Sequence, residues 1–178
     1  ATGDIGCYTL GGRPPFNAME TCVCMGASVG VGLGLRHVLP ETEAAKVISV
    51  IGDSTFVHSG LTGLVDMVYN PPPNGHVVLV VDNGTTAMTG LQEHPGTGRA
   101  LDHTPAPRVS IEGIARAMGI EHVHVVDPMA DREGFHKLVE DSLASKELVF
   151  IVARRPCSLA APKIEQYEQA ACASEVKE

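Results

Sequence analysis

Two short apolar runs on either side of a helical pattern form the most regular part of the chain. The first run covers residues 47–51 and ends at a polar turn over residues 52–55. Residues 55–69 then carry apolar side chains at the spacing of a helix, and a segment rich in proline at 70–75 breaks it. The second run covers residues 77–81. This order predicts strand, turn, helix, loop and strand, which together form one βαβ unit.

The same alternation extends in both directions along the chain. Strands that alternate with helices are typical of a parallel sheet covered on both faces. The expected fold class is therefore α/β, a three-layer αβα arrangement with a mostly parallel sheet. The remaining elements that we predict are strands at residues 4–9, 122–126 and 148–153 and helices at 22–39, 110–118 and 131–145.

The chain has 178 residues, which suits one domain with a sizeable core. We expect residues 1–156 to form that domain and residues 157–178 to form a carboxyl-terminal tail. The tail can form a helix but is only weakly apolar, so a mobile tail and a docked helix both remain open. Because the chain begins without methionine, directly at a predicted strand, we expect it to be a piece of a longer enzyme.

Charge and composition exclude several classes of protein. The net charge is −8, from 13 lysines and arginines against 21 acidic residues, which argues against binding nucleic acid or a membrane surface. No apolar run approaches the roughly 20 residues that span a bilayer, and the first residues do not resemble a signal peptide. Five cysteines without a disulfide spacing predict reduced thiols and a cytoplasmic location.

The candidate chemistry lies where the two strands of the βαβ unit end. Asp53 follows the first strand and Asn83 follows the second, so both should lie at the carboxyl edge of the sheet. Their side-chain oxygens suit Mg²⁺, and Gly84 allows the backbone to turn the Thr85 carbonyl toward the same ion. A helix that starts near Ser54 also directs free N–H groups to this place, which suits an anion. The pattern predicts a metal-bridged diphosphate.

Other segments have two interpretations each. The small residues Gly26, Ala27 and Ser28 begin a helix that either faces a cofactor or packs tightly against the sheet. His58 lies one turn beyond the candidate diphosphate site, where it either acts near the cofactor or only packs. Residues 86–107 form a long loop without apolar periodicity, which we expect to cover the cofactor. We expect the loop histidines, including His94, to be exposed.

Several blocks of the sequence are similar to a known family. Gly52-Asp53-Ser54 followed by Asn83 about 30 residues later resembles the thiamine diphosphate motif. The longer text resembles the alpha subunit of the indolepyruvate type of 2-oxoacid:ferredoxin oxidoreductase. The resemblance covers roughly residues 2–156, and four blocks in order carry it: residues 4–11 (DIGCYTLG), 24–28 (CMGAS), 52–60 (GDSTFVHSG) and 83–98 (NGTTAMTGLQEHPGTG).

The resemblance implies a thiamine diphosphate- and Mg²⁺-dependent enzyme that converts an aryl 2-oxoacid such as indolepyruvate to an acyl-CoA by oxidative decarboxylation. Such an enzyme needs an activating glutamate, iron–sulfur clusters, coenzyme A and ferredoxin. We find neither that glutamate nor clustered cysteines in the sequence, so we expect them from other domains or subunits of an oligomer. The isolated chain should be inactive. The expected metal ligands are Asp53, Asn83 and the Thr85 carbonyl, and the expected cofactor contacts are Gly26, Ala27, Ser28, Gly52, Asp53, Ser54, Thr55, Asn83, Thr85 and Met88.

Two alternatives remain open. A thiamine-dependent decarboxylase without redox chemistry would share the metal motif, and a non-catalytic assembly subunit would share the fold. Met88 bears on the substrate, because relatives that use pyruvate carry asparagine at the aligned position. This departure implies a larger or more apolar 2-oxoacid.

Overall fold

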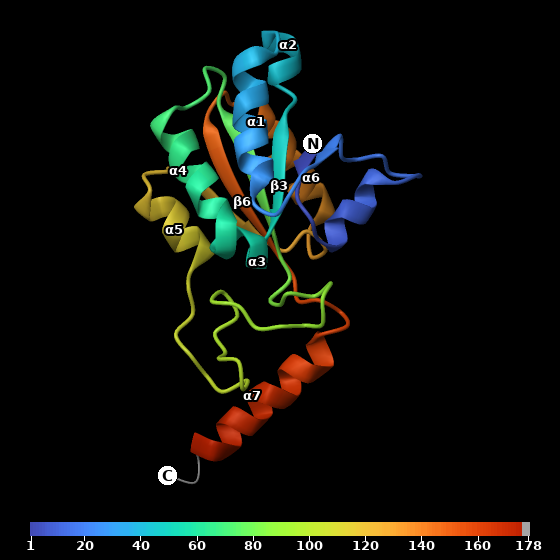
Figure 1. The fold of residues 1–178 in the computed structure, drawn as a ribbon, viewed down its shortest axis with the longest axis vertical. Helices are drawn as coiled ribbons and strands as arrows, with labels where there is room; N and C mark the ends of the chain where they lie inside the picture. Colours follow the sequence, from blue (N-terminus) through green and yellow to red (C-terminus); the bar gives the residue numbers. More distant parts are fainter. Residues whose placement is uncertain (176–178) are drawn as a thin grey trace.

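A computed structural model describes residues 1–175, and side chains for residues 1–169. Its centre is a sheet of six parallel strands in the order β2-β1-β3-β4-β6-β5. Figure 1 shows this sheet behind the helices of one face. The predicted fold class, an αβα arrangement with a parallel sheet, is confirmed. In chain order the strands are β1 (Thr2–Gly3), β2 (Thr21–Cys22), β3 (Ile48–Gly52), β4 (His76–Asp82), β5 (His122–Val126) and β6 (Leu148–Arg154).

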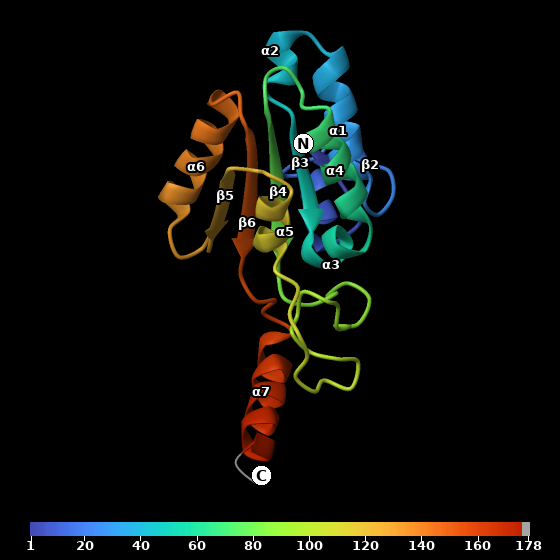
Figure 2. The same cartoon turned by 90° about the vertical axis from the view of Figure 1, so that its left-hand side faces the viewer.

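Helices cover both faces of the sheet (Figure 2). On one face α1, α4 and α5 pack over a core that contains Phe56 and Phe150, and on the other face α6 packs over Val77 and Ile151. The helices are α1 (Ala27–Val38), α2 (Glu41–Ala44), α3 (Asp53–Thr55), α4 (Leu61–Tyr69), α5 (Ile111–Ala117), α6 (Arg132–Ala144) and α7 (Ala161–Glu175), with a 3-10 helix η1 (Cys7–Gly12) and a π-helix η2 (Phe56–Gly60).

The register of the central strands aligns their carboxyl ends. β3 pairs with β4 over five residues, so that Gly52 lies opposite Val81, and β4 pairs with β6 over seven, so that Asp82 lies opposite Arg154. These strands are rich in valine and isoleucine, as expected for a parallel sheet that is buried on both faces. The residues that follow β3 and β4 therefore emerge side by side at one edge of the sheet.

The amino-terminal prediction is wrong in detail. Residues 4–9 do not form a strand, because β1 ends at Gly3 and η1 takes up most of that segment. The helix predicted at residues 55–69 is present, but it starts at Asp53 and passes through the π-helix before α4. The two-residue strand β2 and the short α2 are not predicted, since segments of two to four residues carry no periodicity.

Within the described part of the tail, α7 leaves the body of the domain beyond the carboxyl ends of the strands (Figures 1 and 2). It lies beside the 86–107 loop, where the Tyr167 ring stacks on His103 with centroids 4.0 Å apart. The described part of the tail is therefore a helix in contact with this loop. The last residues of the tail, 176–178, lie outside the described residues. No helix among the described residues is long and apolar enough to cross a membrane.

A buried polar cluster joins α1 to the sheet. Ser49 Oγ lies 2.8 Å from His76 Nε2 and donates to the Ser28 carbonyl at 2.9 Å. A Cβ at Gly32 would lie 2.1 Å from Ser49 Oγ, so glycine is what lets α1 approach this closely. Burial, together with the nearby charge on Arg36, lowers the pKa of His76 to about 3, so the imidazole is neutral in the folded protein.

We predict that His76 makes the fold sensitive to mild acid. Its folded pKa is below the ordinary value, so below about pH 6.5 the unfolded chain binds a proton that the folded chain refuses. The free energy of unfolding should then fall by up to about 2 kcal/mol between pH 7 and pH 5. Urea unfolding at several pH values measures this. His76→Gln should flatten the dependence, and the exposed His136→Gln should not. The same slope in His76→Gln and wild type would contradict the prediction.

Candidate functional site

The two candidate ligands of the sequence analysis meet in one pocket at the carboxyl edge of the sheet. Asp53 begins the helix after β3, and Asn83 directly follows β4. Both line a pocket whose other polar residues include Thr85 and Thr86. The order of the strands produces this meeting, because β3 and β4 are neighbours and parallel.

Asp53 is buried and held by several donors. Its side chain is about 3% exposed. Oδ1 accepts from the Ser54 N–H at 2.8 Å, and Oδ2 accepts from the Gly84 N–H at 2.9 Å. His94 Nε2 lies 3.2 Å from the same Oδ2. The carboxylate is therefore fixed in orientation before any ligand arrives.

Gly84 provides the turn that joins the two strand ends. Its φ of 73° is in the left-handed region, which glycine adopts without strain. In this conformation its N–H points at Asp53 Oδ2 and also lies 3.2 Å from Asp82 Oδ1. The next N–H, of Thr85, donates to Asn83 Oδ1 at 3.1 Å. This bond fixes the orientation of the Asn83 amide and identifies its oxygen, which is the acceptor.

A second buried carboxylate lies beside the first. Asp82 accepts from Arg154 Nε at 2.6 Å, and Arg154 Nη2 continues to Glu112 Oε2 at 2.7 Å. Burial raises the pKa of Asp82 and the nearby Asp53 adds to this, while the Arg154 bond opposes it. The bond from Arg154 lowers the pKa of Glu112 to about 2. The sequence analysis did not identify this network, since its members lie on β4, β6 and α5.

The other predicted contacts divide into two groups. Seven of them lie in the pocket, namely Gly52, Asp53, Ser54, Thr55, Asn83, Thr85 and Met88. The remaining three, Gly26, Ala27 and Ser28, do not line it. Instead Asp4 accepts from the N–H groups of Gly26 and Ser28 at 3.0 and 2.8 Å. A Cβ at Gly26 would also lie 2.5 Å from Ser59 Oγ. These observations favour the tight-packing interpretation for the start of α1.

The structure also places the two histidines discussed in the sequence analysis, His58 and His94. His58 is exposed in the π-helix and is not among the residues that line the pocket. We predicted an exposed His94, and this is wrong: it is 8% exposed and contacts Asp53. A loop without periodicity gives no signal for such a contact.

The amino-terminal segment supplies pocket residues that the sequence analysis did not single out. Tyr8, from η1, lines the pocket, and its hydroxyl accepts from the Gly52 N–H at 3.1 Å. Burial raises the pKa of the Tyr8 phenol, so this hydroxyl stays protonated further into the alkaline range than an exposed tyrosine. Ile5 and Met25 add an apolar wall, with Met88 facing from the loop. The pocket thus has a polar end at Asp53 and Asn83 and an apolar end.

The polar end fits a metal that brings further ligands with it. Among the described residues no group of three or more His, Cys, Asp or Glu could hold a metal alone. Mg²⁺ commonly takes only one or two side-chain oxygens from a protein when phosphate oxygens and water complete its shell. Asp53 and Asn83 offer that partial set, beside the main-chain N–H groups at the start of the helix.

Comparison with known proteins agrees with this geometry. A family model described as the C-terminal TPP-binding domain of thiamine pyrophosphate enzymes matches residues 4–153. The chain belongs to this family. The match includes Asp53, Asn83 and all the strands except β1 and the last residue of β6, and it leaves out α7.

This thiamine pyrophosphate-binding domain is similar in sequence to part of a subunit of indolepyruvate oxidoreductases. It is 43% identical over 156 residues to the indolepyruvate oxidoreductase subunit IorA of Archaeoglobus fulgidus, covering 88% of this chain and 24% of that protein. Against the IorA subunit of Pyrococcus horikoshii it is 40% identical over 166 residues, covering 88% and 25%. The chain thus spans about a quarter of the length of these relatives.

A solved structure shares the fold of the domain. This is a 2-oxoglutarate:ferredoxin oxidoreductase from Magnetococcus marinus with 2-oxoglutarate, coenzyme A and succinyl-CoA bound. The TM-score is 0.65 at 14% identity, over 87% of this chain and 53% of that one.

We predict that Gly84 is required for its conformation and not for space. A Cβ at Gly84 would meet nothing within 4 Å, so Gly84→Ala should cost only the left-handed strain, about 1–2 kcal/mol. Gly34→Ala is the matched control, since it also has open space but lies in α1, where alanine should add about 0.5–1 kcal/mol of stability. Urea unfolding compares the two. Effects of the same sign would contradict the role of the turn.

Proposed function

We propose that the chain binds the Mg²⁺–diphosphate end of thiamine diphosphate in a 2-oxoacid:ferredoxin oxidoreductase of the indolepyruvate type. The observation that carries this proposal is the convergence of Asp53 and Asn83 on one pocket, where the N–H of Gly84, the residue after Asn83, donates to Asp53 Oδ2. The family and the IorA relatives support the cofactor and the class of reaction.

The proposed metal ligands are one oxygen of Asp53, the amide oxygen of Asn83 and the main-chain carbonyl of Thr85. Gly52, Ser54 and Thr55 lie beside them in the pocket, where the hydroxyl groups of Ser54 and Thr55 and the Thr55 N–H can donate to phosphate oxygens. Thiamine diphosphate supplies a thiazolium that stabilises the carbanion left when a 2-oxoacid loses carbon dioxide. The task of this chain is to hold the charged end of the cofactor so that the ring is correctly placed.

The apolar end of the pocket suits aromatic groups. Ile5, Met25 and Met88 line it, and Tyr8 adds a ring. Met88 is 50% exposed, so its side chain is available to a ligand. We infer that this wall contacts the cofactor and an aryl 2-oxoacid such as indolepyruvate, with Met88 favouring a large apolar substrate.

The complete reaction needs groups from outside this chain. We propose that residues 1–156 form the cofactor-binding domain, that residues 157–178 extend it, and that other domains or subunits of an oligomer carry the activating glutamate and the iron–sulfur clusters. The clusters would pass electrons to ferredoxin, and coenzyme A would take the acyl group in the cytoplasm. The names of the IorA relatives favour this oxidative chemistry over a non-oxidative decarboxylase or an assembly subunit.

We predict that thiamine diphosphate binds only with a divalent metal and that Asp53→Ala abolishes this binding. Asp53 supplies the only carboxylate among the proposed ligands, so its loss should weaken metal-dependent binding more than the roughly 10–100-fold seen for outer contacts. Calorimetric titration with and without Mg²⁺ measures this. Asp141→Ala, an exposed acid on α6, controls for net charge. Equal affinity in Asp53→Ala and wild type would exclude this metal site.

We also predict that the purified 178-residue chain does not turn over 2-oxoacids, even with cofactor, Mg²⁺ and an electron acceptor. The polar end can bind the diphosphate, but proton transfer on the ring needs a carboxyl group within about 3 Å of it. Carbon dioxide release from indolepyruvate and pyruvate is the assay. Sustained release above a control with cofactor alone would show that the activating carboxylate belongs to this chain.

A further inference from the structure

His94 connects the 86–107 loop to the carboxylate at the centre of the proposed metal site. The side chain is buried, with 5% of it exposed, and Nε2 lies 3.2 Å from Asp53 Oδ2. Asp53 is 3% exposed, so the contact is shielded from water. The two residues are 41 positions apart in the chain, and the loop therefore folds back to make this contact.

The other ring nitrogen fixes the tautomer of His94. The Gly96 N–H donates to Nδ1 at 3.2 Å, so Nδ1 must carry a lone pair and the proton is on Nε2. Nε2–H then donates to Asp53 Oδ2. A Cβ at Gly96 would lie 3.0 Å from His94 Cε1, which shows how closely the backbone holds the ring. The imidazole is therefore a neutral donor with one orientation.

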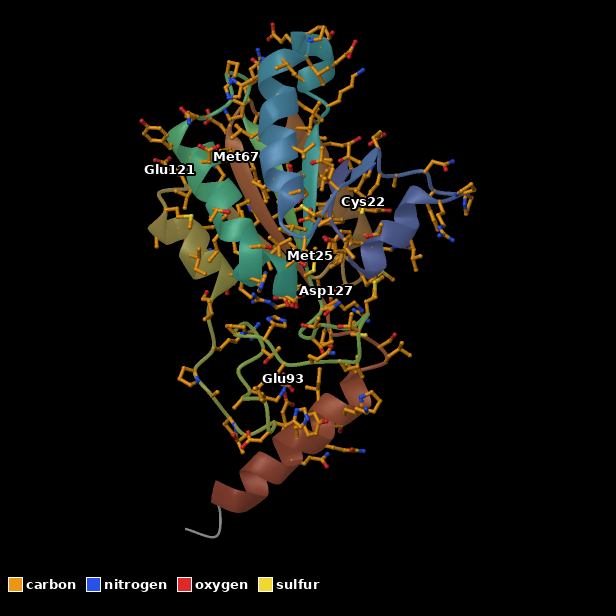
Figure 3. The ribbon with its side chains drawn as sticks, in the orientation of Figure 1. Cys22, Met25, Met67, Glu93, Glu121 and Asp127 are labelled. Carbon is orange, nitrogen blue, oxygen red and sulfur yellow. The ribbon has the colours of Figure 1, made fainter. Side chains whose placement is uncertain are left out.

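The loop around His94 has its own anchor. Glu93, labelled in Figure 3, lies in the loop beside α7. Its carboxylate accepts from Arg99 Nε at 2.9 Å and from His103 Nδ1 at 3.0 Å, and His103 stacks on Tyr167. Glu93 therefore ties the loop to itself and to α7, while the adjacent His94 contacts the metal site. These contacts hold the backbone of the loop next to His94 in place.

The two neighbouring carboxylates differ in their partners. Arg154 compensates the charge of Asp82, with its Nε 2.6 Å from Asp82 Oδ2. The donors that the structure gives Asp53 are the N–H groups of Ser54 and Gly84 and the neutral ring of His94. Neutral donors orient a carboxylate and leave its charge available, whereas an arginine would compete with a cation. Asp53 is thus the carboxylate prepared for a metal.

We propose that His94 is a positioning residue of the metal site: it holds Asp53 Oδ2, together with the Gly84 N–H, in the orientation that binds the cation. The inference rests on the proposed function, since it assumes that Asp53 ligates Mg²⁺. Donors that orient a metal-binding side chain without touching the metal commonly contribute 10–100-fold to metal affinity.

The test is the Mg²⁺ dependence of thiamine diphosphate binding in the purified protein, measured by calorimetry. His94→Leu removes the donor at similar size and should raise the dissociation constant of Mg²⁺ about 10–100-fold. His94→Gln places an N–H near the position of Nε2 and should recover most of this loss. His136→Leu, an exposed histidine on α6, should have no effect. Urea unfolding without ligands confirms that each variant is folded, and a purely structural role would change that stability without changing the affinity of the folded protein.

The outcomes separate the two proposals. If wild type binds the cofactor with Mg²⁺ and His94→Leu binds equally well, the positioning role is wrong and the proposed function stands. If wild type shows no metal-dependent binding, the proposed function fails, and the positioning role with it. Electron paramagnetic resonance with Mn²⁺ in place of Mg²⁺ tests whether a nitrogen binds the metal directly. Nitrogen coupling that disappears in His94→Leu would make His94 a direct ligand and overturn the positioning role.

Discussion

Two buried carboxylates share one N–H group at the carboxyl edge of the sheet, and the rest of the site depends on how each charge is compensated. Gly84 N–H contacts both Asp53 and Asp82. Burying a carboxylate without a partner costs several kcal/mol, so both need compensation. Asp82 obtains it from Arg154, whereas the donors that the described residues give Asp53 are two main-chain N–H groups and the His94 ring. In this account a bound cation compensates Asp53, which couples the fold to the cofactor.

The part of the fold with strong periodicity could be predicted from the sequence, and the part without it could not. The apolar pattern changes from that of a strand to that of a helix and back along β3, α4 and β4. Their order, and the meeting of Asp53 with Asn83, could therefore be predicted from this pattern alone. Residues 4–9 are a short segment of mixed apolar and polar residues, which the sequence analysis predicts to be a strand. Its actual conformation depends on tertiary contacts, such as the bonds from the start of α1 to Asp4.

The long loop shows the same limit at the site itself. Composition predicted a functional loop over the cofactor but could not show that Glu93 anchors it or that His94 is buried against Asp53. These contacts join residues across turns, where no repeat exists. The consequence for function is that the pocket is lined from three directions: the strand ends, the amino-terminal 3-10 helix with Tyr8, and the loop with Met88.

The central claim is that the edge formed by Asp53 and Asn83 holds the metal and the diphosphate. Anomalous diffraction from crystals grown with Mn²⁺ and thiamine diphosphate tests it most directly, since it locates the metal independently of activity. The account predicts a peak in direct contact with oxygens of Asp53 and Asn83, at a distance close to the roughly 2.0–2.1 Å of Mg²⁺ sites. A metal bound at Asp82, or a diphosphate away from the start of the helix after β3, would contradict it.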